Sequence, residues 1–409
     1  RLYQLSKMDT KKVDDEFNDL KTAIAEYNAI LSSRNLQLGI LLAELDEMVE
    51  KHGDERRTNI DPMPLSMDRE DLVEERAIVI SLSEDNYIRH LPVEAFRVQN
   101  RGGKGLKGVA TKDEDFPKSI LTCFSKDRLL IFTDQGRVYG LKAWETPQGS
   151  RHSRGSHIRN LIERLRDDEK VVTILPISKE VQENPEGHYL IFATREGIVK
   201  RSELADYTRI NRNGKYALKF KTETDALVAV REATDEDHVV MVSKFGRACR
   251  FKPSETKENP DGSIGFTVKV QGRVTGGVRG MKLKSEDEVV GMIATSNEET
   301  HVLTLSKFGM AKRSKLGDGE MHEVTDENGK PVIDLRTGEV KQERDGYRKT
   351  NRGAGGVGTM KLDAEHGDEI VRVHTIPDLG DQLFLLTGKG MMIRVRADQT
   401  KETTGKVTK

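Results

Sequence analysis

The feature of this chain that most limits its fold is a β-hairpin pattern that occurs six times. Each copy has an apolar strand, a tight turn that begins with Ser or Thr, and a second strand with basic residues. Five copies place glycine three residues after that Ser or Thr, and the first copy has Asn86 there. This spacing predicts a type I turn followed by one left-handed residue, a conformation that glycine adopts freely and asparagine tolerates. The copies span residues 77–89, 129–139, 190–200, 239–249, 302–312 and 383–393.

A second repeated element lies between the hairpins: a glycine-rich or basic loop, followed by an apolar strand. Acidic connectors, such as Asp113–Asp115, close the units. Small sheets repeated in this way predict a propeller-like ring of blades. Whether the ring closes stays open, because the sixth loop lies at the end of the chain. The loops are residues 99–105, 151–155, 211–215, 274–279, 351–355 and 403–406.

Residues outside the repeats predict two further elements. Val13, Phe17 and Leu20 begin an apolar seam with helical spacing, which breaks at residues 32–35 and restarts at Leu38. We expect an antiparallel helical hairpin over 1–58, either a coiled-coil arm or dimerisation element, or an ordinary hairpin. Residues 59–76 then predict a linker before a β domain at 77–409. The polar stretch 317–348 predicts an extra β-ribbon, with disorder as the alternative.

Composition limits the partners of the chain. Charged residues make up 33%, but the net charge is only −1. The first 60 residues hold 9 Lys/Arg and 12 Asp/Glu, so the remainder carries a net +2. A site for a polyanion therefore requires cations to be gathered on one surface. Two separated cysteines and the absence of a long apolar run predict a soluble protein of a reducing cytoplasm, with no membrane contact.

Several motifs of catalytic and cofactor sites are absent or misplaced. The G-x-G-x-x-G pattern occurs at 103–108 and 353–358, but at equivalent points of the repeat and without the strand and helix that a dinucleotide site needs. No P-loop, H-E-x-x-H or C-x-x-C occurs. We therefore expect no catalytic residues, no metal and no cofactor within this chain.

The first loop carries the most specific signal. Gln99, Asn100, Arg101, Gly102, Gly103, Lys104 and Gly105 combine cations and amides with glycines that leave the backbone N–H groups open to a phosphate. This run resembles the box Gln-Arg-Arg-Gly-Gly-Lys-Gly of bacterial DNA gyrase A subunits, with Asn100 in place of Arg. The repeats resemble the six-bladed β-pinwheel at the C-terminus of that family, and Arg56–Thr58 with the helices resembles the end of its breakage–reunion module.

The resemblance implies a function. In this family double-stranded DNA wraps around the rim of the pinwheel, and a type IIA topoisomerase then introduces negative supercoils. The resemblance implies the gyrase B subunit and a second A subunit as partners in an A2B2 assembly, with ATP and Mg²⁺ used in the full complex. It also implies a cytoplasmic, nucleoid-associated location. The catalytic tyrosine and the ATPase site would lie elsewhere.

Wrapping without base readout needs phosphate contacts along a bent path. Each repeat offers cations on its second strand and in its loop, which predicts a continuous basic rim. Besides residues 99–105, the predicted DNA-binding residues are Lys107, Arg89, Arg137, Arg151, Arg154, Lys200, Arg201, Arg212, Lys215, Arg247, Arg250, Arg279, Lys312, Arg313 and Arg352.

Two alternatives remain. The A subunit of topoisomerase IV, a decatenase, has a similar domain, but its blades usually lack an intact box. A propeller that binds proteins on one face would need apolar or aromatic hot spots in exposed loops. The loops here consist mainly of Gly, Arg, Lys and Asn, and Trp144 is the single tryptophan of the chain.

Overall fold

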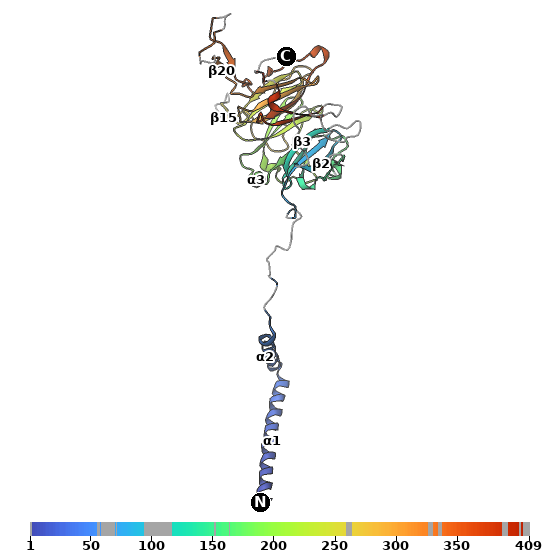
Figure 1. Ribbon diagram of the computed structural model, residues 1–409, viewed down its shortest axis with the longest axis vertical. Coiled ribbons are helices and arrows are strands. Elements are labelled where there is room, and N and C mark those ends of the chain that lie inside the picture. The colour runs from blue at the N-terminus through green and yellow to red at the C-terminus, as the bar shows by residue number, and fades with distance from the viewer. Residues whose placement is uncertain are drawn as a thin grey trace. The chain divides into compact units, whose positions relative to one another are not determined.

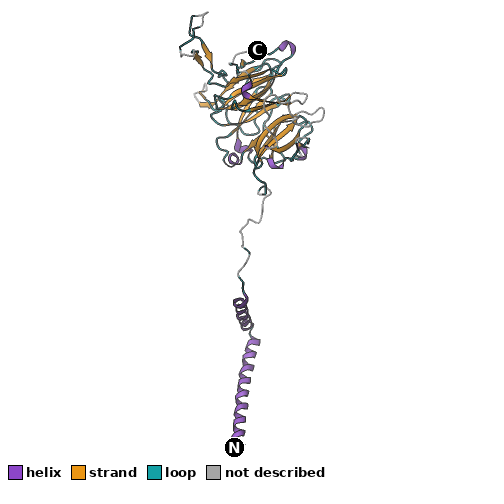
Figure 2. Cartoon of the chain, viewed as in Figure 1, coloured by secondary structure: helices purple, strands orange, loops and turns teal. Residues whose placement is uncertain are grey.

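The computed structural model divides into two units, residues 1–67 and 68–409. Helices form the first unit and strands dominate the second (Figures 1 and 2). The structure describes residues 2–54, 58, 70, 72–93, 117–150, 153–162, 164–258, 264–325, 330–333, 338–386, 392–400 and 402–403. The predicted box at 99–105 lies outside the described residues, as do Lys107 and Arg151.

Two helices make up the described part of the first unit: α1 (Leu2–Ser32) and α2 (Arg34–His52). A single extended residue, Ser33, separates them, and Gly53 follows the second. The predicted break and end are confirmed. The predicted antiparallel packing on a shared seam is wrong in this structure, since the seam residues are exposed, from Leu38 at 46% to Leu31 at 73%. The physical reason is the link: reversing the chain between helices takes a loop of about 2–5 residues.

The second unit contains a repeated antiparallel sheet. In four copies the strand order is the same: the strand after the loop, the two hairpin strands, and a fourth strand from the next unit. The first sheet holds β1 (Ala77–Ser83), β2 (Tyr87–Pro92), β3 (Pro117–Phe124) and β6 (Ser156–His157). The second holds β4 (Arg128–Thr133), β5 (Arg137–Lys142), β7 (Val171–Ile177) and β10 (Lys215–Tyr216). The third holds β8 (Tyr189–Thr194), β9 (Ile198–Glu203), β11 (Leu227–Ala233) and β16 (Val278–Arg279).

The fourth sheet holds β12 (His238–Ser243), β13 (Arg247–Phe251), β17 (Val289–Thr295) and β22 (Val357–Gly358). The fifth has three described strands, β18 (His301–Ser306), β19 (Ala311–Lys315) and β23 (Ile370–Ile376). The sixth repeat forms the hairpin β24 (Gln382–Leu386) and β25 (Met392–Arg396). The fold is therefore mainly β and propeller-like.

Short elements complete the unit. A ribbon of β14 (Thr256–Glu258) and β15 (Ile264–Phe266) leaves the fourth repeat. A second ribbon, β20 (Met321–Glu323) with β21 (Gln342–Arg344), agrees with the ribbon interpretation of the polar insert and projects from the sheets in Figure 1. The short helices are α3 (Lys179–Glu183), η2 (Ala143–Glu145), η3 (Ile158–Asn160), η4 (Leu204–Tyr207), η5 (Ala364–His366) and η6 (Ala397–Gln399).

The hairpin turns have the predicted geometry. The backbone φ is positive at Asn86 (62°), Gly136 (71°), Gly197 (82°), Gly246 (74°) and Gly309 (83°). In each turn this residue donates its N–H to the carbonyl of the Ser or Thr three residues earlier, at 3.0–3.1 Å. Glycine or asparagine is required there because other residues are strained at positive φ.

The cores lie between successive sheets, which explains the unbroken apolar runs. Leu129 and Ile131 pack with the first sheet, whereas Leu130 and Phe132 pack with the third. Both faces of the second sheet are thus buried, and the third and fourth sheets repeat the arrangement. Each large apolar side chain so buried stabilises the fold by roughly 1.5–3 kcal/mol.

Candidate nucleic-acid interface

The two edges of each sheet face different surroundings. At one edge the strands β7, β11, β17 and β23 lie side by side from sheet to sheet. The opposite edge is formed by β6, β10, β16 and β22, which arrive from the next unit. These short strands therefore mark the outer edge. We call the chain segments that carry them the crossing segments: residues 146–162, 207–222, 266–285 and 346–362.

The crossing segments contain cations and no acids. The whole chain has 68 Asp and Glu among 409 residues, yet the four segments have none. Residues 95–112, which include the box, are also free of acids. The described cations of the crossing segments are Arg154, Arg159, Arg209, Arg212, Lys215, Lys219, Lys221, Lys269, Arg273, Arg279, Lys282, Lys284, Arg348, Lys349, Arg352 and Lys361.

Most of these cations are available to a ligand. Arg154, Arg159, Arg273 and Arg352 are half-buried, and the other twelve are exposed. The sequence pattern had predicted only five of the set: Arg154, Arg212, Lys215, Arg279 and Arg352. The signal that would have found the others is the absence of Asp and Glu over each whole segment, rather than the basic character of its glycine loop.

Six predicted DNA-binding residues are instead buried: Arg89, Lys200, Arg201, Arg250, Lys312 and Arg313. They lie three or four residues after the left-handed turn residue, on the second hairpin strand. At these two positions the strand faces the next sheet or a crossing segment rather than solvent. The prediction of phosphate contacts is therefore corrected for these six residues.

The charged groups of five of these residues bind backbone carbonyl groups, and that of Arg201 binds a carboxylate. The Nη1 of Arg250 donates to the carbonyls of Leu316, Gly317 and Tyr347, at 2.8, 2.8 and 2.9 Å. The Nζ of Lys200 donates to those of Ala217 (2.7 Å) and Arg273 (2.5 Å). A charged donor satisfies several carbonyls that sheet pairing leaves unpaired, and such bonds contribute roughly 1.5–3 kcal/mol each.

The other four buried cations also hold chain segments. Arg89 donates to the carbonyls of Ser150 and Ser153, and Lys312 to that of Thr359. Arg313 donates to Thr400, while Arg201 pairs with the carboxylate of Asp235. Burial lowers the pKa of Lys200 to about 7 and that of Lys312 to about 8, because desolvation disfavours the charged amine.

Two further predicted residues, both on second hairpin strands, are intermediate in exposure, and both are held by partners. Arg137 forms an ion pair of 3.0 Å with Glu169, whose side chain is fully buried. Arg247 donates from Nε and Nη2 to the carbonyls of Gly355 and Gly356, at 2.6 Å each. These bonds engage the guanidinium group of each arginine and reduce its capacity to bind a phosphate.

The second repeat departs from the pattern in an informative way. Gly140 occupies the position of Arg201, Arg250 and Arg313. A Cβ on Gly140 would lie 2.0 Å from the carbonyl oxygen of Ile210, so no side chain fits. Arg128 of the neighbouring strand β4 supplies the missing donor and binds that carbonyl. Arg128 was not among the predicted residues, although the glycine at a position that is otherwise basic signals a substitute.

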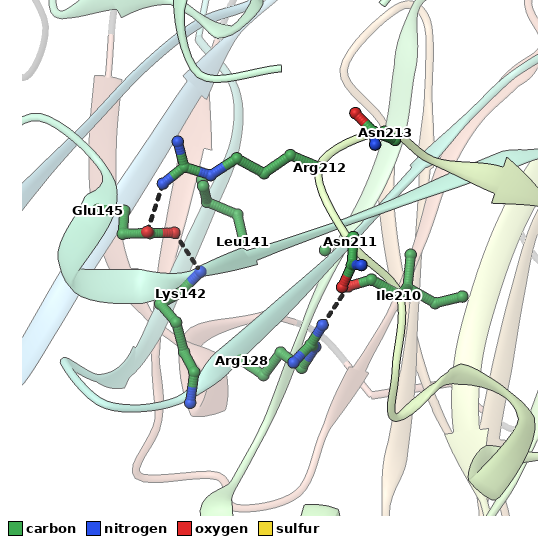
Figure 3. A pocket seen from close by; sticks show the side chains of 9 residues that line it. Arg128, Leu141, Lys142, Glu145, Ile210, Asn211, Arg212 and Asn213 are labelled. Atoms are coloured by element: carbon green, nitrogen blue, oxygen red, sulfur yellow. Dashed lines mark hydrogen bonds and ion pairs between the residues drawn. The ribbon is translucent and has the colours of Figure 1, made fainter. Parts of the chain in front are cut away.

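A hollow of about 340 Å³ lies beside this junction, between β4, β5 and the crossing segment that leads to β10. We call it the β5 hollow. Arg212 pairs with the carboxylate of Glu145, which also accepts the backbone N–H of Lys142 at 3.0 Å (Figure 3). The hollow is lined by Arg128, Gly140, Leu141, Lys142, Glu145, Ile210, Asn211, Arg212 and Asn213.

Acidic groups collect at the hairpin turns rather than on the crossing segments. Asp225, Asp287 and Asp368 are buried and accept the backbone N–H of Glu196, Phe245 and Phe308 in the adjacent turns. The acidic connectors are therefore partly structural. Arg154, Arg159, Arg212 and Lys349 of the crossing segments pair with acids from other segments. The other twelve described cations of these segments have no ion pair among the described residues, although the chain is nearly neutral.

Among the described residues, no three His, Cys, Asp or Glu side chains are grouped so that they could hold a metal ion. No described helix is long and apolar enough to cross a membrane.

Comparison with solved structures shows the fold of the second unit. The C-terminal domain of DNA gyrase A matches 81% of this chain and 93% of its own, with a TM-score of 0.59 and 22% identity. The C-terminal domain of DNA topoisomerase IV matches 82% and 89%, with a TM-score of 0.54 and 21% identity. At this identity the two likenesses establish architecture only.

Comparison of sequences is more specific. The chain is 37% identical over 397 residues to the DNA gyrase A subunit of Staphylococcus epidermidis, and 35% identical to that of Staphylococcus aureus. Each alignment covers 97% of this chain but only 39–40% of the relative, so the chain spans about two fifths of these proteins. The family model of the DNA gyrase C-terminal domain, a β-propeller, matches 77–121, 127–178, 188–233, 267–296, 343–377 and 381–404. The chain therefore belongs to the family of DNA gyrase A subunits, and its repeated sheets are that family's C-terminal β-propeller domain.

Proposed function

We propose that the β unit binds double-stranded DNA along its outer edge and bends it around the blades. The observation that carries this proposal is the placement of acid-free crossing segments at that edge. Bending 20–30 base pairs by 40–90° costs roughly 1–6 kcal/mol, so the contacts must be numerous and spread along the path. The exposed cations of successive sheets meet that requirement without reading bases.

The proposed anchor of the wrap is the box, Gln99 to Gly105 with Lys107, and Arg151 extends it. These residues continue the pattern of the crossing segments, since residues 95–112 are also basic and free of acids. Their glycines suit close approach of a phosphate to the backbone N–H groups. Asn100 keeps a hydrogen-bond donor at the position where the family box has arginine.

A six-bladed ring is part of this proposal. The hairpin β24–β25 follows the fifth sheet as a sixth repeat. Nη2 of Arg372, in the fifth sheet, lies 3.9 Å from Oε1 of Glu84, in the hairpin turn of the first, so the array curves back toward its first sheet. A curved array with its ends close together gives DNA a continuous outer path.

For the whole protein we propose the role of the gyrase A subunit in a type IIA topoisomerase. DNA wrapping then brings two segments of the duplex across each other, and passage of one through the other introduces negative supercoils. The gyrase B subunit would hydrolyse ATP with Mg²⁺, a second A subunit would complete the A2B2 assembly, and the complex would act on cytoplasmic nucleoid DNA. The sequence relatives, which are named as DNA gyrase A subunits, favour this role over that of topoisomerase IV.

The test is to bind the 409-residue chain to nicked circular DNA at graded salt, ligate, and read the topology. Wrapping predicts trapped positive writhe, together with an affinity that falls steeply with salt concentration. Binding without writhe at any salt concentration would reject the proposal. Replacing Arg101 and Lys104 by Ala tests the anchor: writhe should vanish while much of the binding remains.

A further inference from the structure

The β5 hollow has the charge of an anion site. Three of its lining residues are cations from three different elements: Arg128 on β4, Lys142 at the end of β5, and Arg212 on the crossing segment. Its single lining carboxylate belongs to Glu145. The net formal charge of the lining is therefore positive, and it stays positive when Glu70, which pairs with Lys142, is also counted.

The donors of the hollow are held in place. Arg128 is fixed through its bond to the carbonyl of Ile210, and its buried Nε has no partner within the described part of the chain. Lys142 is oriented by Glu70, whose Oε1 lies 2.9 Å from Nζ. The amides of Asn211 and Asn213 also line the hollow (Figure 3). Preset donors reduce the ordering cost of binding a ligand.

From this arrangement we infer that the β5 hollow binds one phosphate group. The inference deepens the proposed function, because a phosphodiester of the wrapped duplex is one source of that group, and free phosphate is the other. A volume of about 340 Å³ holds a phosphate with part of a sugar or a few waters, each water taking about 30 Å³. Planar guanidinium groups such as those of Arg128 and Arg212 match phosphate oxygens.

Glu145 allows a substitution that should increase the affinity of the hollow for phosphate. Its carboxylate pairs with Arg212 and faces the same hollow, so it competes with an incoming phosphate for that guanidinium. A glutamine at this position still accepts the N–H of Lys142 but carries no charge. Removing this one negative charge should therefore strengthen phosphate binding, whereas removing the charge of Arg212 should weaken it.

The experiment titrates the 409-residue chain with inorganic phosphate by calorimetry. We expect Arg212→Gln to weaken binding about fivefold and Glu145→Gln to tighten it about threefold, because charge pairs that involve an exposed side chain such as Arg212 are modest. The matched controls come from a second exposed ion pair, Lys252 with Glu236 at 2.8 Å, which lies outside the crossing segments. Lys252→Gln and Glu236→Gln should each change the affinity less than about twofold.

A second titration, with duplex DNA at graded salt, identifies the source of the phosphate. If the hollow binds a phosphodiester, Arg212→Gln also makes the plot of log affinity against log salt concentration less steep, by about 0.9 in the magnitude of its slope. If the slope is unchanged while the phosphate affinity responds, the site serves free phosphate. Unchanged phosphate affinity in both Arg212→Gln and Glu145→Gln overturns the inference. A wild-type chain that binds phosphate in the hollow but traps no writhe would reject the proposed function and leave this site standing.

Discussion

The second hairpin strands and the crossing segments both carry Lys and Arg in every described repeat, yet they use them in opposite ways. On the strands, side chains such as Lys200 and Arg250 are 0% and 1% exposed and bind carbonyl groups. On the crossing segments, residues such as Lys215 and Lys219 are exposed, and the described residues include no ion pair to either. The buried set fastens the segments that display the exposed set.

This difference shows that a basic residue in a repeat is not by itself a DNA contact. A buried cation costs desolvation, which its hydrogen bonds must offset. Carbonyl groups at the blade junctions supply such bonds, although Nε and Nη2 of Arg250 and Nη1 of Arg313 are buried with no partner among the described residues. An exposed cation near no acid costs nothing to keep charged, and it is free to replace counterions on a phosphate backbone.

The largest expected effect is on folding, from the buried set. Arg250→Met removes a donor from three carbonyl groups in a buried site, of which that of Leu316 keeps the N–H of Tyr347, and should reduce the free energy of unfolding by about 3 kcal/mol. Urea denaturation of the full chain measures this. A variant as stable as the wild type would show that these carbonyls are satisfied without the guanidinium. At low temperature, where it stays folded, Arg250→Met should keep most of its DNA affinity, because the replaced side chain is buried.

The exposed set should show the reverse. Replacing Lys215, Lys219 and Lys221 by Gln should leave the urea midpoint unchanged and weaken DNA binding about tenfold or more at low salt. The salt slope should fall by about 0.9 for each phosphate that the variant no longer neutralises. Binding at graded salt gives both numbers. An unaltered slope would place the duplex away from this crossing segment.

The dependence of stability on pH tests the buried lysines directly. The pKa of Lys200 is lowered to about 7 in the folded chain, so from there up to pH 10.5 the unfolded chain binds the extra proton. Stability should therefore rise with pH in this window, by at most about 1.4 kcal/mol per unit. Lys200→Met should remove this contribution and leave that of Lys312, which begins near pH 8. Urea midpoints at about pH 6.5, 7.5 and 9 measure it; identical pH profiles would contradict it.

The smallest effect is expected for an exposed ion pair in neither set. Lys252→Ala removes the contact with Glu236, whose side chain is 77% exposed, and should change stability by less than about 0.5 kcal/mol. Its DNA affinity should fall by less than that of any variant in a crossing segment. Thermal denaturation with a binding titration measures both. If each lost charge reduced DNA affinity as much here as in the triple variant at Lys215, Lys219 and Lys221, affinity would depend on net charge rather than on position.

The local elements were predictable because they depend on neighbouring residues. A glycine or asparagine at a fixed distance from Ser or Thr determines each turn, and its positive φ is found wherever the structure describes it. The break between the helices at Ser33 and the ribbon in the polar insert also follow from local composition. The family, too, was indicated by the seven residues of the box, which are consecutive in the chain.

Burial could not be predicted in the same way. Arg250 and Lys215 look alike in sequence, because each lies close to a glycine in a basic run. What separates them is the fourth strand, which comes from the next unit and covers the second hairpin strand of the preceding one. The exposed seam of α1 makes the same point, since spacing indicates an apolar face but not the surface that would cover it.

The sequence by itself determined the repeat, its turns, the acid-free segments and the family, because these properties lie within short stretches of chain. Only the tertiary structure decided which cations are buried, that Arg128 replaces the donor missing at Gly140, and that the β5 hollow forms beside it. Those outcomes depend on contacts between residues tens of positions apart, and strand exchange between blades creates these contacts only after the sheets have assembled.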